Sequence, residues 1–215
     1  MKIPCSGIIL AGGLNKRFGG KNKAFIHCGG KRILDRVYDV LQTIFDEIIL
    51  VTNDPLPYLE WDLKIVADLF PFRSSLTGIH AGLFYATNPF AFVTACDTPF
   101  LKKALVQKIL DETDPKADLT IPETKAGLEP LCAVYSKKTL SRIEPYLIQE
   151  KVKIIRVFGT KRVKKIPENL LRQADPDLVS FFNINAPDDL KEAEEIAANE
   201  LLIDSRQTRQ SLNLG

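Results

Sequence analysis

Residues that commonly build metal centres and disulfide frameworks are scarce in this 215-residue sequence. Its four cysteines, Cys5, Cys28, Cys96 and Cys132, are scattered without a C-x-x-C pair, and only two histidines accompany them. This pattern argues against zinc and favours reduced thiols in the core. No run approaches the roughly 20 apolar residues of a membrane span, and the first residues lack the apolar core of a signal peptide. The sequence therefore predicts a cytoplasmic protein without membrane contact.

An excess of one charge is also lacking, since 29 Lys and Arg residues nearly balance 27 Asp and Glu residues. The net charge of +2 gives no support to a nucleic-acid surface, so an anionic partner must be bound locally. Two common phosphate-binding patterns are missing as well, namely G-x-x-x-x-G-K-[ST] and a G-x-G-x-x-G that opens a helix. Their absence excludes P-loop hydrolysis and the usual dinucleotide-binding fold. The length fits one α/β domain with an ample core.

A glycine-rich, cationic segment at residues 6–24 is the most informative part of the sequence. Residues 7–11 form a β-branched apolar run, which is typical of a strand buried on both faces of a parallel sheet. Paired glycines at 12–13 and 19–20 follow, together with four cationic side chains. Glycine lets backbone N–H groups approach an anion closely. We therefore predict a phosphate-binding loop, in preference to a plain turn whose lysines face water.

The spacing within this segment resembles a known signature. Leu10-Ala11-Gly12-Gly13, Arg17-Phe18-Gly19-Gly20 and Lys23 are similar to the LAGG-x(3)-R-[MF]-G-G-x(2)-K motif of nucleotidyltransferases, most closely the MobA-type molybdenum cofactor guanylyltransferases. With later matches, the resemblance covers about residues 6–199. It implies transfer of GMP from GTP to molybdopterin, with Mg²⁺ as cofactor. It also implies a single three-layer α/β domain, whose Rossmann-like, mostly parallel central sheet is flanked by helices.

The segment that follows predicts a βαβ unit. Apolar positions mark one face of a helix over residues 32–45, and apolar runs at 47–52 and 64–67 predict strands. Asn53 and Asp68 follow these strands. A right-handed crossover places Asn53 at the carboxyl edge of the sheet, where the glycine-rich loop also lies.

A carboxylate follows the next buried-type strand, predicted at residues 90–96. Because ligands of α/β sheets bind at the carboxyl ends of the strands, Asp97 is placed to hold a hard cation through oxygen. The alternative is that Asp-Thr-Pro is only a turn and a helix start. Cys96-Asp97-Thr98-Pro99 resembles the family's C-D-x-P metal motif, so the resemblance makes Asp97 the Mg²⁺ ligand.

Two further stretches match the family with substitutions. Ser74-Ser75 stands where the family has Gly-Pro ahead of a helix, and serine can cap a helix start. Residues 181–190 resemble the ending N-x-N-[TS]-P-[ED]-[ED]-L, with Ala186 at the Ser or Thr position. On a strand at 181–185, Asn183 and Asn185 would share one side. The resemblance places them near the pterin-bearing substrate; a hydrogen-bonded strand end is the equal alternative.

The remaining pattern is less specific. It predicts helices at 102–111, 137–149 and 152–157, strands at 118–122 and 130–135, and a final helix to about 198. Lys161, Arg162, Lys164 and Lys165 alternate with apolar residues, which indicates an exposed strand whose cations face water or, as the alternative, an anionic substrate. We expect residues 1–200 to form the nucleotidyltransferase domain and 201–215 a flexible polar tail.

The implied reaction needs positioning and charge stabilisation rather than a side-chain nucleophile. We assign Lys23 to the charge at the α-phosphate, Arg17 to the leaving pyrophosphate and Asp97 to Mg²⁺. The expected GTP-binding residues are Leu10, Ala11, Gly12, Gly13, Lys23, Asn53, Asp68 and Asp97. Transient contact with molybdoenzymes or cofactor-insertion proteins is a further expected partnership.

Three other functions stay open at this point. The cytidylyltransferase of the same cofactor typically carries Ala where Gly13 stands, and the extra Cβ would narrow a base pocket. Sugar-phosphate nucleotidyltransferases share the loop but usually have longer chains. A carrier that holds nucleotide or pterin without chemistry would not need both Lys23 and Asp97. These comparisons favour an enzyme that uses GTP.

Overall fold

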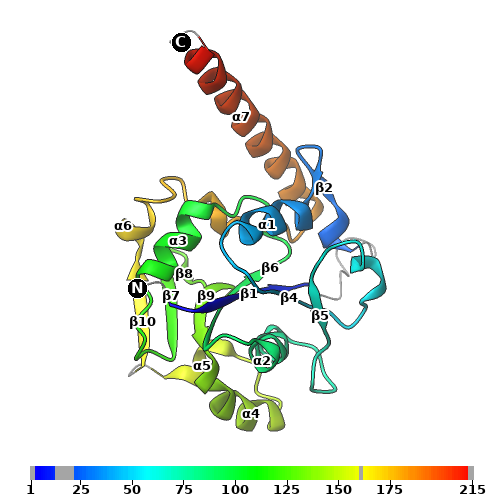
Figure 1. The fold of residues 1–215 in the computed structure, drawn as a ribbon, viewed down its shortest axis with the longest axis vertical. Coiled ribbons are helices and arrows are strands. Elements are labelled where there is room, and N and C mark those ends of the chain that lie inside the picture. Colours follow the sequence, from blue (N-terminus) through cyan, green and yellow to red (C-terminus); the bar gives the residue numbers. More distant parts are fainter. Residues whose placement is uncertain (1–2, 13–21, 160–161, 213–215) are drawn as a thin grey trace.

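The computed structural model describes residues 3–12, 22–159 and 162–212, with side chains as far as residue 200. Gly13, Arg17 and Lys161, which belong to the predicted sites, lie outside these ranges. The described chain forms a central sheet of eight strands with helices on both faces (Figure 1). The predicted three-layer α/β fold is confirmed.

Four parallel strands form the half of the sheet that contains the N-terminal strand. In spatial order they are β6 (Phe90–Ala95), β1 (Cys5–Leu10), β4 (Ile48–Val51) and β5 (Lys64–Val66). Their nearly continuous apolar sequences suit burial on both sheet faces, and all six residues of β6 are buried. Because these strands are parallel, the segments that follow them meet at one edge of the sheet.

The other half of the sheet contains the antiparallel pairings. The strand β9 (Cys132–Ser136) lies between β6 and β7 (Leu119–Thr124) and is antiparallel to both. At the outer edge, β10 (Val163–Pro167) runs parallel to β7, and β8 (Gly127–Leu128) forms a short hairpin with β7. The sheet is therefore mostly parallel, as predicted.

Helices cover the two faces of the sheet over separate buried clusters. On one face lie α1 (Ile33–Gln42) and α3 (Lys103–Asp111), and on the other lie α2 (Ser75–Tyr85), α4 (Leu140–Ile148) and α5 (Ile154–Phe158) (Figure 1).

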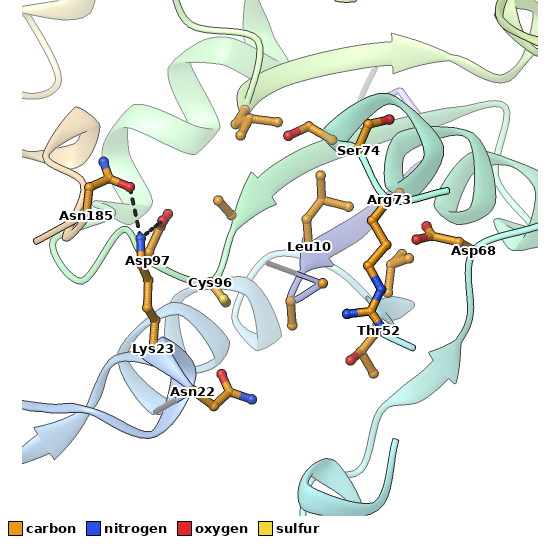
Figure 2. A pocket seen from close by; sticks show the side chains of 17 residues that line it. Leu10, Asn22, Lys23, Thr52, Asp68, Arg73, Ser74, Cys96, Asp97 and Asn185 are labelled. Atoms are coloured by element: carbon orange, nitrogen blue, oxygen red, sulfur yellow. Dashed lines mark hydrogen bonds and ion pairs between the residues drawn. The ribbon is translucent and has the colours of Figure 1, made fainter. Parts of the chain in front are cut away.

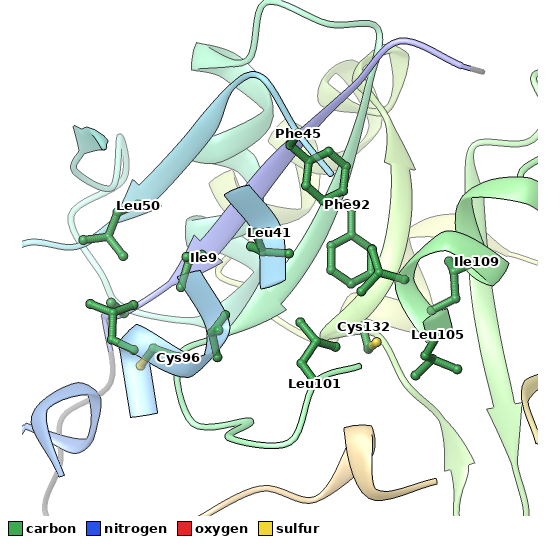
Figure 3. Packing of buried hydrophobic residues seen from close by; sticks show 14 of the residues in the cluster. Ile9, Leu41, Phe45, Leu50, Phe92, Cys96, Leu101, Leu105, Ile109 and Cys132 are labelled. Carbon is green, nitrogen blue, oxygen red and sulfur yellow. The ribbon is translucent and has the colours of Figure 1, made fainter. Parts of the chain in front are cut away.

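The alternation of side chains along β1 divides the core between these faces. Ile9 belongs to the cluster that contains Leu41 of α1 and Leu105 of α3 (Figure 3), whereas Ile8 belongs to the cluster under α2. Burial of each such side chain contributes about 1.5–3 kcal/mol.

Close packing fixes α2 against the strand that leads into the glycine-rich segment. A Cβ built at Gly82 would lie 2.7 Å from two carbon atoms of Ile8, which is closer than real Cβ contacts allow. One turn earlier, a Cβ at Gly78 would lie 3.1 Å from Cδ2 of Leu10. The two glycines therefore let α2 approach β1 and set the N-terminus of this helix beside the end of the strand.

The predicted strand at residues 181–185 is absent, so that prediction was wrong. Instead, the 3-10 turn η5 (Val179–Phe181) leads into irregular chain. The N–H of Ile184 donates to the carbonyl of Asp97 at 3.0 Å. Alternating apolar and asparagine residues favoured a strand, but this segment is held at the end of β6 without pairing in the sheet.

The last helix is longer than predicted. It was expected to end near residue 198, but α7 (Pro187–Leu212) continues through most of the segment that we predicted as a flexible tail. Its first turns pack Ala193 and Ala197 against Cys28 and Ile33, and the rest projects away from the sheet (Figure 1). None of the described helices is both long and apolar enough to cross a membrane.

Short elements complete the described chain. They are η2 (Lys23–Phe25), β2 (His27–Cys28), β3 (Lys31–Arg32), η3 (Leu56–Tyr58), η4 (Lys137–Thr139) and α6 (Glu168–Leu171). The turn η2 lies at the end of the glycine-rich segment and begins with Lys23. The sequence pattern did not predict η3, which proves important for the site.

Candidate active site

A pocket of about 460 Å³ opens at the carboxyl ends of the parallel strands. The segments that follow β1, β4, β5 and β6 line it, together with the start of α2 (Figure 2). This is the edge that the sequence predicted, because parallel strands end on the same side of a sheet. The volume lies within the range of small-molecule sites.

The end of β1 forms one wall of the pocket. Leu10, Ala11 and Gly12 line it, as predicted for the first part of the phosphate-binding loop. A Cβ built at Gly12 would have no atom of the described residues within 4 Å, apart from its chain neighbours. The chain can therefore meet a ligand here without an intervening side chain.

Three polar side chains from distant segments meet at another side of the pocket. Nζ of Lys23 lies 3.3 Å from Oδ2 of Asp97 and 2.9 Å from Oδ1 of Asn185. Figure 2 shows both interactions. Asp97 follows β6, Asn185 precedes α7, and Lys23 begins η2. The structure thus brings together the three residues that the sequence assigned to phosphate, metal and pterin substrate.

Local hydrogen bonds place the members of this group. Oδ1 of Asn22 accepts the N–H of Ala24 at 3.1 Å and so caps the turn that carries Lys23. On the other side, Oδ2 of Asp189 accepts the N–H groups of Asn185 and Ala186 at 2.7 and 2.8 Å. Both segments are therefore held by side-chain bonds to backbone donors.

Burial and the charge of a neighbouring residue shift the pKa of Asp97 in opposite directions. Its side chain is 20% exposed, and this burial raises the pKa of the carboxyl above its ordinary value. The ammonium of Lys23 lowers the pKa, but by less. Ionised Asp97 is therefore an energetically costly group, which a further cation would stabilise.

Asp97 suits a hard divalent cation by its donor chemistry. Magnesium is commonly held by one or two carboxylates together with phosphate oxygens of the substrate. The described residues contain no group of three or more His, Cys, Asp or Glu side chains that could hold a metal ion. One carboxylate at the edge of the pocket therefore fits a metal that is bound together with a phosphate-bearing ligand better than a metal held in a closed protein cage.

Asn53 and Asp68 form a reciprocal pair rather than two separate ligands. Nδ2 of Asn53 donates to Oδ2 of Asp68 at 2.8 Å, and Oδ1 of Asn53 accepts the Asp68 N–H at 3.0 Å. Only Asp68 lines the pocket. Its carboxyl has a raised pKa, mainly because of burial. Both residues were expected to bind GTP, whereas the structure places only Asp68 at the pocket, with Asn53 hydrogen-bonded to it as support.

The substituted start of α2 forms a complete capping box. Oγ of Ser74 accepts the N–H of Thr77 at 3.1 Å, and Oγ1 of Thr77 accepts the N–H of Ser74 at 2.9 Å. Both Ser74 and Ser75 line the pocket. The expectation that serine caps this helix is confirmed, so replacement of the family's Gly-Pro leaves a well-formed helix start.

Sequence reasoning missed several lining residues, of which Arg73 is the most prominent. It reaches into the pocket between Asp68 and Thr52 (Figure 2), and its charge lowers the pKa of Asp68. An arginine directly before a helix N-terminus at the ligand edge was the available signal. Thr52 follows β4 and Leu131 precedes β9, but neither has a sequence signal of this kind. Only the fold identifies them as lining residues.

The structure separates Asn183 from the site. Its side chain is exposed, it does not line the pocket, and Nδ2 donates to the carbonyl of Phe181 at 3.2 Å. The prediction that Asn183 and Asn185 point into one site was wrong because the segment is not a strand with a two-residue repeat. Only Asn185 reaches the pocket.

The described cations around β10 are bound by carboxylates. Arg162 pairs with Asp118 at 3.1 Å, Lys164 with Glu112 at 3.1 Å, and Lys165 with Glu123 at 2.7 Å. None of the three cations lines the pocket. They therefore do not contribute to the site, in agreement with the interpretation that they form a solvated face.

All four cysteines carry free thiols, and one of them borders the site. Cys96 lines the pocket, but burial raises the pKa of its thiol to about 12. A neutral thiol is a poor nucleophile and a poor metal ligand. Cys96 is therefore poorly suited to act as a nucleophile or a metal ligand at this pocket.

Comparison with known proteins now supplies the family. A model described as a MobA-like NTP transferase domain matches residues 7–164. The chain belongs to this family. The resemblance that the glycine-rich segment indicated is thereby confirmed, and so is the assignment of the chain to the nucleotidyltransferases.

Relatives of this MobA-like chain agree along most of its length. The molybdenum cofactor guanylyltransferase of Desulfosudis oleivorans is 49% identical over 189 residues, which is 88% of this chain and 94% of the relative. Among solved structures, molybdopterin-guanine dinucleotide biosynthesis protein A from Archaeoglobus fulgidus is 29% identical, with a TM-score of 0.80, and the match covers 90% and 99% of the two chains.

A more distant structure shares the fold alone. The 2-C-methyl-D-erythritol 4-phosphate cytidylyltransferase from Thermus thermophilus is 18% identical, with a TM-score of 0.65, over 92% of this chain and all of the other. A protein named for cytidylyl transfer can therefore have the same architecture. The choice of base must lie in the side chains of the pocket.

Proposed function

We propose that this MobA-like protein transfers GMP from GTP to molybdopterin, which gives molybdopterin guanine dinucleotide and pyrophosphate. The observation that carries the proposal is the meeting of Lys23, Asp97 and Asn185 beside the wall formed by Leu10 and Gly12. The names of the Desulfosudis and Archaeoglobus relatives support the choice of substrates.

The reaction is an in-line displacement at the α-phosphorus of GTP. A phosphate oxygen of molybdopterin forms the new P–O bond as the bond to pyrophosphate breaks. Lys23 donates to the α-phosphate oxygens and offsets the charge that develops there. The Gly12 backbone borders the nucleotide phosphates, and Arg17, outside the described residues, is proposed to face the leaving pyrophosphate.

Asp97 would hold Mg²⁺, which neutralises phosphate charge when it is bound. The side chain of Asn185 contacts the same Nζ of Lys23 as Asp97 does, and it is proposed to face the acceptor. Asp68 and Arg73, on the wall across from Lys23, are proposed to meet the base and ribose. The two substrates would thus flank Lys23, close enough for direct transfer.

The test uses purified protein with a magnesium salt and each of GTP, CTP and ATP, with and without molybdopterin, and measures pyrophosphate release. Release is expected with GTP and only when both magnesium and molybdopterin are present. Clear preference for CTP would instead identify a cytidylyltransferase of the same cofactor. GTP binding without any release would identify a carrier and contradict the proposal.

A further inference from the structure

Tyr58 contacts the chain on both sides of the glycine-rich segment. Its hydroxyl accepts a hydrogen bond from Nδ2 of Asn22 at 2.7 Å and donates to the carbonyl of Ala11 in a longer contact of 3.5 Å. Ala11 directly follows β1, and Asn22 directly precedes Lys23. One hydroxyl therefore joins the two ends of the segment that carries the nucleotidyltransferase signature.

The ring of Tyr58 is fixed by packing. The residue is fully buried at the end of η3, and its ring lies 5.1 Å from that of Phe25 and 6.2 Å from that of Trp61, centroid to centroid. Aromatic neighbours at these distances hold a ring in place and stabilise it. The same burial raises the pKa of the Tyr58 hydroxyl to about 12, so it stays protonated. The hydroxyl is a fixed partner for Asn22 and not a mobile surface group.

Asn22 passes this constraint on to Lys23. Its two amide atoms have different partners, because Nδ2 donates to Tyr58 and Oδ1 accepts the N–H of Ala24. The second bond caps η2, whose first residue is Lys23. The backbone from which the Lys23 side chain reaches Asp97 is therefore oriented by a chain of two hydrogen bonds that starts at Tyr58.

We propose that Tyr58 is a positioning residue, which sets Lys23 at the reacting phosphate through Asn22. The inference rests on the proposed function, since Lys23 must act on the substrate for its placement to matter. Displacement of a catalytic group by about 1 Å can reduce turnover by up to two orders of magnitude. Phenylalanine at position 58 would keep the packing against Phe25 and leave Nδ2 of Asn22 without its acceptor.

The experiment is a double-mutant cycle with Tyr58→Phe and Asn22→Ala, read out as kcat and KM for GTP. Tyr58→Phe is expected to lower kcat about tenfold and to change KM for GTP less, because Lys23 acts on developing charge. In the Asn22→Ala background, Tyr58→Phe should have no further effect, because the path to Lys23 is already broken. Tyr146→Phe is the matched control. It removes a hydroxyl that donates to the Arg156 carbonyl, lies outside the pocket, and should keep the kcat of the parent protein.

Each other outcome overturns the inference. Equal losses from Tyr58→Phe with and without Asn22 would show that the hydroxyl acts by another path. Parent kcat in Tyr58→Phe, combined with a large loss in Lys23→Ala, would remove Tyr58 and leave the proposed function intact. Parent kcat in Lys23→Ala would remove the role of Lys23 itself, and the failure would then lie in the proposed mechanism.

Discussion

Lys23 and Asp97 are 74 residues apart in the chain, yet Nζ of the first lies 3.3 Å from Oδ2 of the second. Both side chains are largely buried, with 15% and 20% of their surfaces exposed. Burial raises the pKa of Asp97 by more than the ammonium lowers it. The pair is therefore retained at an energetic cost, which is common where a group serves function rather than stability.

Replacement of this carboxylate should separate activity from stability. Asp97→Asn keeps the shape of the side chain but removes the charge proposed to hold Mg²⁺, so kcat should fall by about 100-fold or more. Because the folded-state pKa of Asp97 is raised, the ionised carboxyl destabilises the folded protein at neutral pH. The thermal midpoint of Asp97→Asn should therefore rise by a few degrees, as scanning calorimetry at pH 7 would show.

The pH dependence gives the control for this assignment. Asp97 contributes favourably to the stability of the folded protein at pH values below its ordinary pKa of 3.8. This contribution is lost as the pH rises through the higher pKa of the folded state. The stability gain of Asp97→Asn should accordingly shrink as the pH is lowered towards 3.8. A gain that stays constant across this window would mean that ionisation of Asp97 is not its source.

Because Asn53 supports Asp68, we expect the effect of replacing Asn53 on nucleotide binding to disappear once Asp68 has been replaced. Asp68→Ala removes a pocket wall and should raise KM for GTP about tenfold, whereas Asn53→Ala only frees Asp68 and should raise it by about threefold. The double variant should match Asp68→Ala. Steady-state kinetics with saturating molybdopterin measure all three. Additive effects would show that Asn53 contacts GTP directly.

Ala186 precedes α7 and donates its N–H to Oδ2 of Asp189 at 2.8 Å, but alanine has no side-chain oxygen with which to complete a capping box. Ala186→Ser should place a side-chain oxygen at this helix start, where serine is preferred to alanine, and stabilise the protein by about 1 kcal/mol. For a chain of this size, the thermal midpoint should rise by roughly 2–4 °C. Ala186→Val, which adds no acceptor, is the control and should give no such gain.

The close approach of α2 to β1 predicts that Gly82→Ala destabilises the protein, although alanine favours helix. The new Cβ would meet Ile8 at 2.7 Å, and overpacking of this kind costs about 1–3 kcal/mol. Ile8→Ala removes the opposing atoms, so the loss in the double variant should be smaller than the sum of the single losses. Urea titrations of the four proteins test this. Strict additivity would contradict the packing argument.

Much of the fold could be predicted because its parallel strands are buried on both faces. The apolar run at residues 90–96 predicted β6, and Asp97 follows it at the sheet edge where the pocket opens. Similar reasoning placed Asn53 at this edge, since the carboxyl ends of parallel strands meet. These predictions needed only local composition and the topology of parallel sheets.

The remainder depends on contacts between distant residues. Residues 181–185 alternate as a strand would, but a backbone hydrogen bond between Ile184 and Asp97 fixes their conformation instead. Helix α7 continues to Leu212 through residues that appeared to be a polar tail, although leucine, glutamine and arginine, which are frequent there, have high helix propensity. The bond between Asn22 and Tyr58 spans 36 residues and has no local signal. Asn53 could be placed at the correct edge, but not behind Asp68.

Guanylyl transfer from GTP to molybdopterin can be followed through the fate of labelled phosphate. The protein is incubated with a magnesium salt, molybdopterin and GTP labelled either at the α- or at the γ-phosphate, with Asp97→Asn in parallel. We expect the α-label to enter a molybdopterin dinucleotide and the γ-label to leave as pyrophosphate, and we expect Asp97→Asn to do neither at a comparable rate. Release of γ-label as inorganic phosphate, or no α-label on the pterin, would contradict guanylyl transfer.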